Sequence, residues 1–204
     1  NLAEFPLTVL STRHAPGVKT LEFSDIVKGK NGEVVKRNWI ITGADKFGLP
    51  TASDDEVLLG LLKLSVDNGF QDRKVFFTRY ELLGVLRWTT EARSYSRLQK
   101  ALDRLSGVRI KASNAFFDNE TKLHSTKNFG LIDAYELHDG RAQQAKPSYF
   151  VWSETLYKSF QVGFIKKFDL QFYLDLKSAV SKRLYRYLDK HFWYKSRVQV
   201  QLFI

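Results

Sequence analysis

Between Thr78 and Phe117 the sequence reads TRYELLGVLRWTTEARSYSRLQKALDRLSGVRIKASNAFF, and this stretch decides the expected fold. Thr78 and Glu81 stand three residues apart, which is the spacing of a capping box at the start of a helix. The helix that they predict would bury one side consisting of Leu82, Leu83, Val85 and Leu86. A short polar stretch, TTEARS, then separates this helix from a second one.

The second helix is predicted from apolar residues at helical spacing. One face carries residues at positions i, i+3, i+4 and i+7, namely Leu98, Ala101, Leu102 and Leu105. Ser94 is the predicted N-cap, and Gly107 is predicted to end the helix. After Gly107 the apolar period changes from 3.6 to 2, so segments 108–117 and 121–137 are predicted to form a two-stranded ribbon.

The opposite face of this second helix is basic. At about 100° per residue, Arg97, Lys100 and Arg104 fall on one stripe away from the leucines. Arg93 lies just upstream of the predicted cap and points the same way. The neighbouring positions are polar and can form hydrogen bonds, and they are occupied by Ser96, Gln99 and Asp103.

Helix, short turn, helix and ribbon is the order of a winged helix-turn-helix, so the expected fold class is α+β. In that motif the second helix enters the major groove, whose width accommodates an α-helix. Arginine and lysine neutralise phosphates, and serine, glutamine and arginine can read base edges. The alternative is an ordinary amphipathic helix with a solvated basic face.

The predicted DNA contacts come from three elements. The proposed recognition helix contributes Arg93, Ser94, Tyr95, Ser96, Arg97, Gln99, Lys100 and Arg104. The ribbon, as the wing, contributes Lys111, Lys122 and Lys127. The closing helix contributes Arg183 and Arg186, for which a dimer surface or a solvated helix face remain alternatives.

Outside this stretch, the N-terminal part reads as extended structure. Segments 18–27 and 33–43 are predicted strands, joined by a hairpin turn at Asn31-Gly32. A helix should follow, with Ser53 and Glu56 as its capping box and Asn68-Gly69 at its end. The adjacent carboxylates of this first turn, Asp54 and Asp55, are interpreted as complements of the helix dipole.

Residues 168–193 are predicted to close the chain with helical structure, in which Val180, Leu184 and Leu188 recur every four residues. The expected organisation is therefore an N-terminal β-hairpin segment over residues 1–52, packed on a winged-helix domain over residues 53–197.

Charge is distributed unevenly along the chain. Of the formal net charge of +10, residues 73–111 carry +7, from ten basic and three acidic side chains. Residues 158–197 also carry +7, again from ten basic and three acidic side chains, and the remaining segments are weakly acidic. Two separate basic segments favour a polyanionic partner, although solvated helix faces would have the same composition.

Several classes of protein lack their signals in this sequence. There is no cysteine, and no two of the four histidines are spaced as metal ligands, so no metal site is expected. No glycine-rich phosphate loop occurs, so no nucleotide cofactor is expected. No apolar run is long enough to span a membrane, and a cytoplasmic protein is expected. The chain begins at Asn1 and contains no methionine, so we expect it to be part of a longer protein.

Longer words of the sequence resemble the plasmid replication initiator protein A family. They are NLAEFPLTVLSTR, ITGADKFGLPTASDDEVLLGLLKLS, RLQKALDRLSG, ASNAFF and LDLKSAVSKRLYRYLDK, and together they extend from Asn1 to about Trp193. The phrase SAVSKRLYRYLDK also resembles the closing helix of the first winged-helix domain in iteron-binding initiators. The resemblance implies a winged-helix domain that binds repeated sites at a replication origin, and a second DNA-binding region beyond residue 204.

The expected function is therefore non-enzymatic binding of double-stranded DNA at origin repeats. Host proteins, namely an initiator ATPase and the replicative helicase, would open the duplex, and the chain could act as a homodimer. A winged-helix transcriptional repressor is the alternative, because it would use the same contacts. A rolling-circle nicking enzyme would use a tyrosine beside a histidine-hydrophobic-histidine metal motif, and that motif is absent.

Overall fold

The computed structural model describes residues 7–11, 17–28, 32–117, 124–138, 146–161 and 168–192. These residues form a mixed α/β structure with two antiparallel sheets. The strands are β1 (Thr20–Lys28), β2 (Val34–Thr42), β3 (Lys74–Phe77), β4 (Arg109–Phe117), β5 (His124–Gly130), β6 (Ile132–Glu136) and β7 (Ser148–Trp152). The helices are α1 (Ala52–Asp67), α2 (Arg79–Val85), α3 (Ala92–Gly107), α4 (Glu154–Gln161), α5 (Leu170–Asp175) and α6 (Ala179–His191).

The larger sheet has four strands in the order β1-β2-β4-β5. The predicted N-terminal hairpin is confirmed, because β1 and β2 pair antiparallel from Thr20–Thr42 to Lys28–Val34. Strand β2 also pairs with β4, so the hairpin and the ribbon after α3 form one continuous sheet. Trp39 and Ile41 of β2 are fully buried where this sheet meets the helices.

The smaller sheet has three strands in the order β3-β7-β6. The segment 121–137, predicted as one strand, is divided at Leu131 between β5 of the larger sheet and β6 of the smaller one. Buried aromatic side chains line the inner face of β7, where Phe150 and Trp152 pack edge to face at 5.1 Å between ring centroids. The Trp152 indole donates a hydrogen bond to the Ser65 hydroxyl of α1 at 2.8 Å, which fixes the sheet against that helix.

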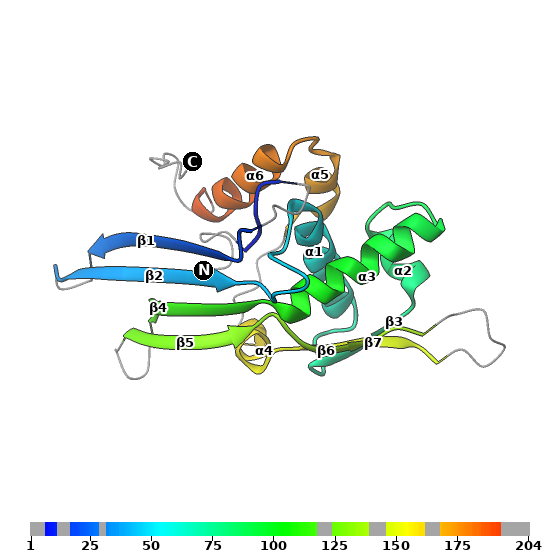
Figure 1. Cartoon of the computed structure of the whole chain (residues 1–204), viewed down its shortest axis with the longest axis horizontal. Helices are drawn as coiled ribbons and strands as arrows, with labels where there is room; N and C mark the ends of the chain where they lie inside the picture. Colours follow the sequence, from blue (N-terminus) through cyan, green and yellow to red (C-terminus); the bar gives the residue numbers. More distant parts are fainter. Residues whose placement is uncertain are drawn as a thin grey trace.

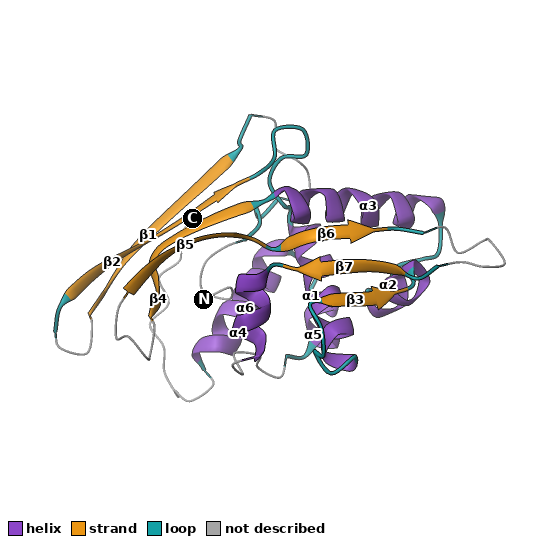
Figure 2. Ribbon diagram, turned by 90° about the horizontal axis from the view of Figure 1, so that it is seen from below, coloured by secondary structure: helices purple, strands orange, loops and turns teal. Residues whose placement is uncertain are grey.

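The two sheets lie at different ends of the molecule, and the helices α1, α2 and α3 pack beside the smaller one (Figure 1). Seen from below, β6 and β7 run alongside α3, while the larger sheet extends away from the helices (Figure 2). Strand β6 ends and strand β7 begins at the end of the molecule where α3 begins.

The N-cap of helix α1 lies two residues before the predicted one. Ser53 and Glu56 were expected to form the box, but Thr51 is the N-cap and Asp54 accepts a hydrogen bond from the Thr51 backbone N–H at 2.6 Å. The extended backbone of Thr51, with φ −99° and ψ 171°, is the geometry that an N-cap requires. The predicted end is confirmed, because Asn68 is the C-cap and Gly69 has φ +69°.

Helix α1 packs closely on α2 because Gly60 has no side chain. A Cβ at that position would lie 2.9 Å from Leu86 Cδ2 and 3.0 Å from Leu82 Cδ1, which is too close for a real contact. The capping box predicted for α2 is confirmed, since the Glu81 N–H donates to the Thr78 hydroxyl and the Thr78 N–H donates to the Glu81 carboxylate.

The packing predicted for α3 is confirmed. All four residues of its apolar face are fully buried, namely Leu98, Ala101, Leu102 and Leu105. The helix ends at Gly107 as expected, and Val108 alone separates it from β4. Val108 is itself fully buried, and a Cβ on Gly107 would lie 2.9 Å from Ala44 Cβ, so the junction is tightly packed.

Helix α6 buries an arginine, whereas the apolar residues that recur every four positions along it are exposed or only partly buried. Val180 is 59% exposed, and Leu184 and Leu188 are only partly buried, whereas Arg186 is 7% exposed. The reason is electrostatic, because the Arg186 guanidinium forms an ion pair with the buried Asp55 carboxylate of α1. Helix α6 is therefore attached to α1 through a buried charge pair in place of an apolar stripe.

Candidate nucleic-acid interface

The segment between α2 and α3 brings the start of α3 to the surface. Ser94 was predicted as the N-cap, but Glu91 takes that position with an extended backbone, and the helix begins at Ala92. The Ser94 N–H donates to the Glu91 carbonyl, and its hydroxyl lies 3.3 Å from that of Thr89. Arg93 is therefore inside the first turn of α3, four residues before Arg97, and continues the basic stripe.

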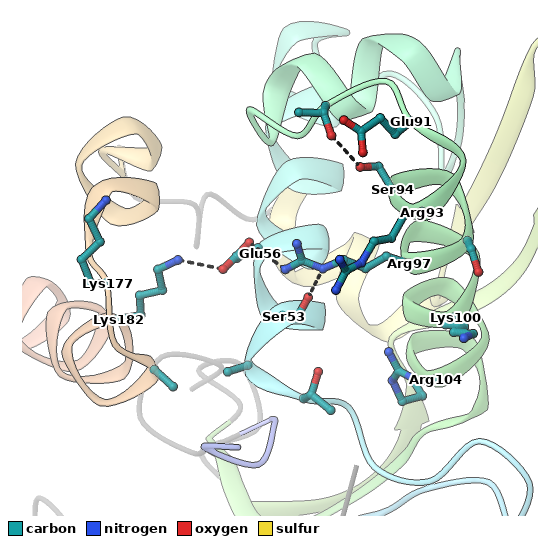
Figure 3. A pocket seen from close by; sticks show the side chains of 15 residues that line it. Ser53, Glu56, Glu91, Arg93, Ser94, Arg97, Lys100, Arg104, Lys177 and Lys182 are labelled. Carbon is teal, nitrogen blue, oxygen red and sulfur yellow. Dashed lines mark hydrogen bonds and ion pairs between the residues drawn. The ribbon is translucent and has the colours of Figure 1, made fainter. Parts of the chain in front are cut away.

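A cleft of about 660 Å³ runs along this stripe, between α3, the start of α1 and the turn from α5 to α6. Figure 3 shows the side chains of α3 on one side of the cleft and those of α6 on the other, with Glu56 of α1 between them. Of the described residues that line the cleft, two are acidic, namely Glu56 and Glu91. Six basic residues line it, namely Arg93, Arg97, Lys100, Arg104, Lys177 and Lys182.

Arg104, predicted as a DNA contact, has a structural partner in Asp54. Its Nε and Nη2 atoms donate to the two Asp54 carboxylate oxygens at 2.6 and 2.8 Å, and Asp54 is fully buried. The hydrogen bonds that Arg104 donates to the Asp54 carboxylate raise the pKa of Arg104 above its ordinary value. The guanidinium thus joins α3 to the start of α1, and the predicted DNA contact at Arg104 stays a prediction.

Arg97 lies along the floor of the cleft. Its Nε donates to the Ser53 hydroxyl at 2.8 Å, its guanidinium lies 3.6 Å from the Glu56 carboxylate, and it stacks 3.7 Å from the ring centre of Trp88. Burial lowers the pKa of Arg97 from its ordinary value, while Glu56 and Asp54 act in the opposite direction. Three neighbours therefore hold this side chain against the protein.

Four of the remaining residues predicted as DNA contacts on α3 project outward. Arg93, Ser96, Gln99 and Lys100 are exposed, and within the part of the chain that the structure describes no ion pair engages the two cations. Ser94 and Tyr95 are partly buried, and Arg79 of α2 lies 5.0 Å from the Tyr95 ring centre. The outer face of α3 therefore offers charge together with uncommitted hydrogen-bonding groups.

The lysines predicted for the wing lie elsewhere. Lys111 and Lys127 are exposed on β4 and β5, in the sheet that extends away from α3 (Figure 1). Lys122 lies outside the described residues. The ribbon was expected to stand beside α3, but its first strand pairs with β2, and the hairpin beside α3 is β6–β7.

On α6, the two predicted arginines are largely covered. Arg186 is committed to Asp55, and burial lowers the pKa of Arg183 to about 10, with the neighbouring charge of Arg186 acting in the same direction. The cations that α6 and the preceding turn present to the cleft are Lys182 and Lys177, which were not among the predicted contacts. The basic composition of segment 158–197 indicated that cations such as these two lysines could bind a polyanion. Which of them face the cleft depends on the orientation of α6, which the sequence does not show.

The acidic pair Asp54-Asp55 was interpreted as a complement of the helix dipole, and both residues do lie in the first turn of α1. Each also neutralises a distant arginine. Among the described residues, no group of three or more histidine, aspartate or glutamate side chains could hold a metal ion. No described helix is both long and apolar enough to cross a membrane.

Comparisons with known proteins define the class of protein to which these sheets, the exposed basic helix and the adjoining cleft belong. The family model of replication initiator protein A matches residues 1–202. The chain therefore belongs to the replication initiator protein A family, as the resemblance of its sequence words indicated.

A curated relative is described as a putative replication protein of Wigglesworthia glossinidia brevipalpis. It is 25% identical over 131 residues, which cover 63% of this chain and 46% of the relative. The chain thus spans about half the length of that relative.

Two solved structures of RctB share the fold. The crystal structure of RctB domains 2 and 3 superposes on this chain with a TM-score of 0.59 at 12% sequence identity. The superposition covers 93% of this chain and 70% of the RctB chain. A second RctB structure gives the same TM-score at 13% identity, with 89% and 68% coverage.

Proposed function

We propose that this chain is a winged-helix module that binds duplex DNA at repeated sites in a plasmid replication origin. The observation that carries the proposal is the outer face of α3, where Arg93, Ser96, Gln99 and Lys100 are exposed together. Membership of the replication initiator protein A family supports a role at an origin. Because its proposed partner is a plasmid origin, the protein would act in the bacterial cytoplasm.

The order of elements supports the winged-helix interpretation. Helix α1, strand β3, helices α2 and α3 and the hairpin β6–β7 follow one another along the chain. The second hairpin strand, β7, pairs with β3, which gives the sheet order β3-β7-β6 expected of a winged helix. Strands β4 and β5 are then an insertion between the recognition helix and the wing, and they join the N-terminal hairpin.

In the proposed complex, the first half of α3 enters the major groove, which is wide enough for a helix. Lys100 and Arg93 neutralise phosphates beside it, and Ser96 and Gln99 face the base edges. Strand β6 packs beside α3, so the strands of the hairpin β6–β7 lie next to the bound DNA in the proposed complex (Figure 1).

We further propose that the chain acts by binding alone, and that a host initiator ATPase and the replicative helicase are recruited to the complex. Footprinting on DNA flanking the native gene tests the proposal. Tandem protected repeats are expected, whereas one palindrome at a promoter would support a repressor. When the protein is incubated with supercoiled origin DNA and magnesium or manganese, the DNA should stay intact. A strand break would contradict the proposed non-enzymatic role.

Replacing Lys100 with alanine should make DNA binding less dependent on salt. Each lost phosphate contact lowers the slope of log K against log salt by about 0.9, and affinity for all sequences should fall together. The measurement is a fluorescence anisotropy titration at several salt concentrations. Lys158→Ala, an exposed lysine on α4, is the matched control and should keep the wild-type slope. Equal salt slopes in the two variants would count against phosphate binding by the outer face of α3.

Gln99→Ala should reduce discrimination between target and scrambled DNA. A glutamine that grips adenine by two hydrogen bonds contributes roughly 1–3 kcal/mol of specificity. The two affinities should be measured at one stated salt concentration. Lys127→Ala on β5 serves as the control, and its ratio of affinities should equal that of the wild type. An unchanged ratio in Gln99→Ala would place base reading on another element.

A further inference from the structure

The cleft beside α3 has a second basic wall that the proposed recognition helix does not account for. Lys177 precedes α6 and is exposed, and Lys182 lies one turn into that helix. Figure 3 shows both side chains across the cleft from Arg93, Lys100 and Arg104. Cations from elements far apart in sequence therefore face one common space of about 660 Å³.

The position of the cleft relative to α3 indicates what it could hold. A helix seated in the major groove has one sugar-phosphate strand along each of its sides. On one side of α3 the neighbouring element is β6, where the Tyr135 hydroxyl donates to Asp103 of α3 at 2.6 Å. On the other side the neighbouring feature is the cleft, so a phosphate strand on that side would run through it.

The helix starts around the cleft add to its positive potential. Its lining includes residues from the first turns of α1, α3 and α6, for example Ser53, Ser94 and Ala179. The N-terminal end of each helix carries partial positive charge, which favours an anion close by. Six basic side chains, three helix starts and two carboxylates line the same volume, and Asp54 already neutralises one of the six cations, Arg104.

One of these carboxylates occupies the place between the two walls. Glu56 is 15% exposed, its carboxylate accepts from Lys182 Nζ at 2.7 Å, and it lies 3.6 Å from the Arg97 guanidinium. It thus bridges the α6 wall to the α3 wall. A phosphate group entering the cleft would meet the same two cations and compete with Glu56 for them.

We propose that the cleft binds the phosphate backbone of the DNA strand beside α3, with Lys177 and Lys182 as its second wall and Glu56 as an internal competitor. This inference rests on the proposed function, and it adds a clamp of two walls to a recognition helix. In this arrangement Lys182 of α6 and Lys177 before it belong to the DNA-binding surface, and Arg186 attaches the helix to α1.

The test measures the affinity of the 204-residue chain for a duplex of arbitrary sequence. Lys177→Ala should weaken binding by about threefold to tenfold and lower the salt slope by about 0.9, because one phosphate contact is lost. Lys158→Ala on α4 removes the same charge far from the cleft and should leave both values unchanged.

Glu56→Gln provides the sharper measurement, because the clamp and a purely structural role predict opposite results. Removing the competing carboxylate should tighten DNA binding by about threefold or more, since it removes repulsion of the phosphate and releases Lys182. A thermal unfolding curve establishes beforehand that the variant is folded. Weaker binding by folded Glu56→Gln would overturn the inference.

Two further results separate this inference from the proposed function. If Lys100→Ala weakens binding while Lys177→Ala binds as the wild type does, the clamp is wrong and the recognition helix stands. If neither variant changes binding, the proposed function itself is wrong. Free pyrophosphate is the control ligand, and a cleft in which Lys177→Ala lowers pyrophosphate binding without affecting DNA would also overturn the clamp.

Discussion

Asp55→Asn is expected to lower the free energy of unfolding by roughly 3–5 kcal/mol, because it leaves a buried arginine without its neutralising carboxylate. Asp55 accepts a hydrogen bond from the Tyr173 hydroxyl at 2.7 Å and pairs with Arg186, and the two charged residues are 6% and 7% exposed. Burial alone disfavours the charge on Arg186, and Asp55 outweighs that effect, so the pKa of Arg186 is raised. Urea unfolding followed by circular dichroism gives the measurement.

Asp67→Asn on the same helix is the matched control for this substitution. Asp67 pairs with Lys63 one turn away and is 48% exposed, so its loss should change stability by no more than about 0.5 kcal/mol. Both variants replace aspartate with asparagine on α1, so a difference in their stabilities reports the effect of burial. Equal stabilities for Asp55→Asn and Asp67→Asn would mean that α6 is not held by the buried pair.

Leu102→Ala should destabilise the protein by roughly 2–5 kcal/mol, because it opens a cavity in the core under α3. Leu102 is fully buried together with Leu98 and Leu105. Val66→Ala on α1 is the control, since Val66 is 47% exposed. Thermal unfolding gives the comparison, and a melting temperature for Leu102→Ala within about two degrees of the wild type would show that the apolar face is not the packed one.

Local signals were sufficient to predict the central helices. The capping box at Thr78 and the apolar spacing from Leu98 to Leu105 depend on residues within one or two turns, so they can be read directly from sequence. The larger sheet could not be predicted in the same way. Alternation identifies β4 as a strand, but its partner β2 lies some 70 residues earlier, and period 2 does not specify a neighbour.

The candidate site was predicted unevenly for the same reason. The exposed positions on α3 follow from helical geometry once its apolar face is known, and Gln99 and Lys100 are where the sequence placed them. Arg104 and Arg186 look like surface cations in sequence. Their partners, Asp54 and Asp55, lie 50 and 131 residues away, so only the folded chain shows that these arginines are structural.

The junction at Val108 has a consequence for geometry on DNA. Helix α3 and strand β4 are separated by one buried residue and therefore move as one rigid unit, so the larger sheet keeps a fixed angle to α3. If α3 occupies the groove as proposed, the rotational position of each binding site around the double helix also sets the direction in which the larger sheet projects from the DNA. Copies bound at repeats spaced by whole turns of about 10.5 base pairs would present their sheets along one side of the duplex, and a half-turn insertion would point alternate sheets in opposite directions.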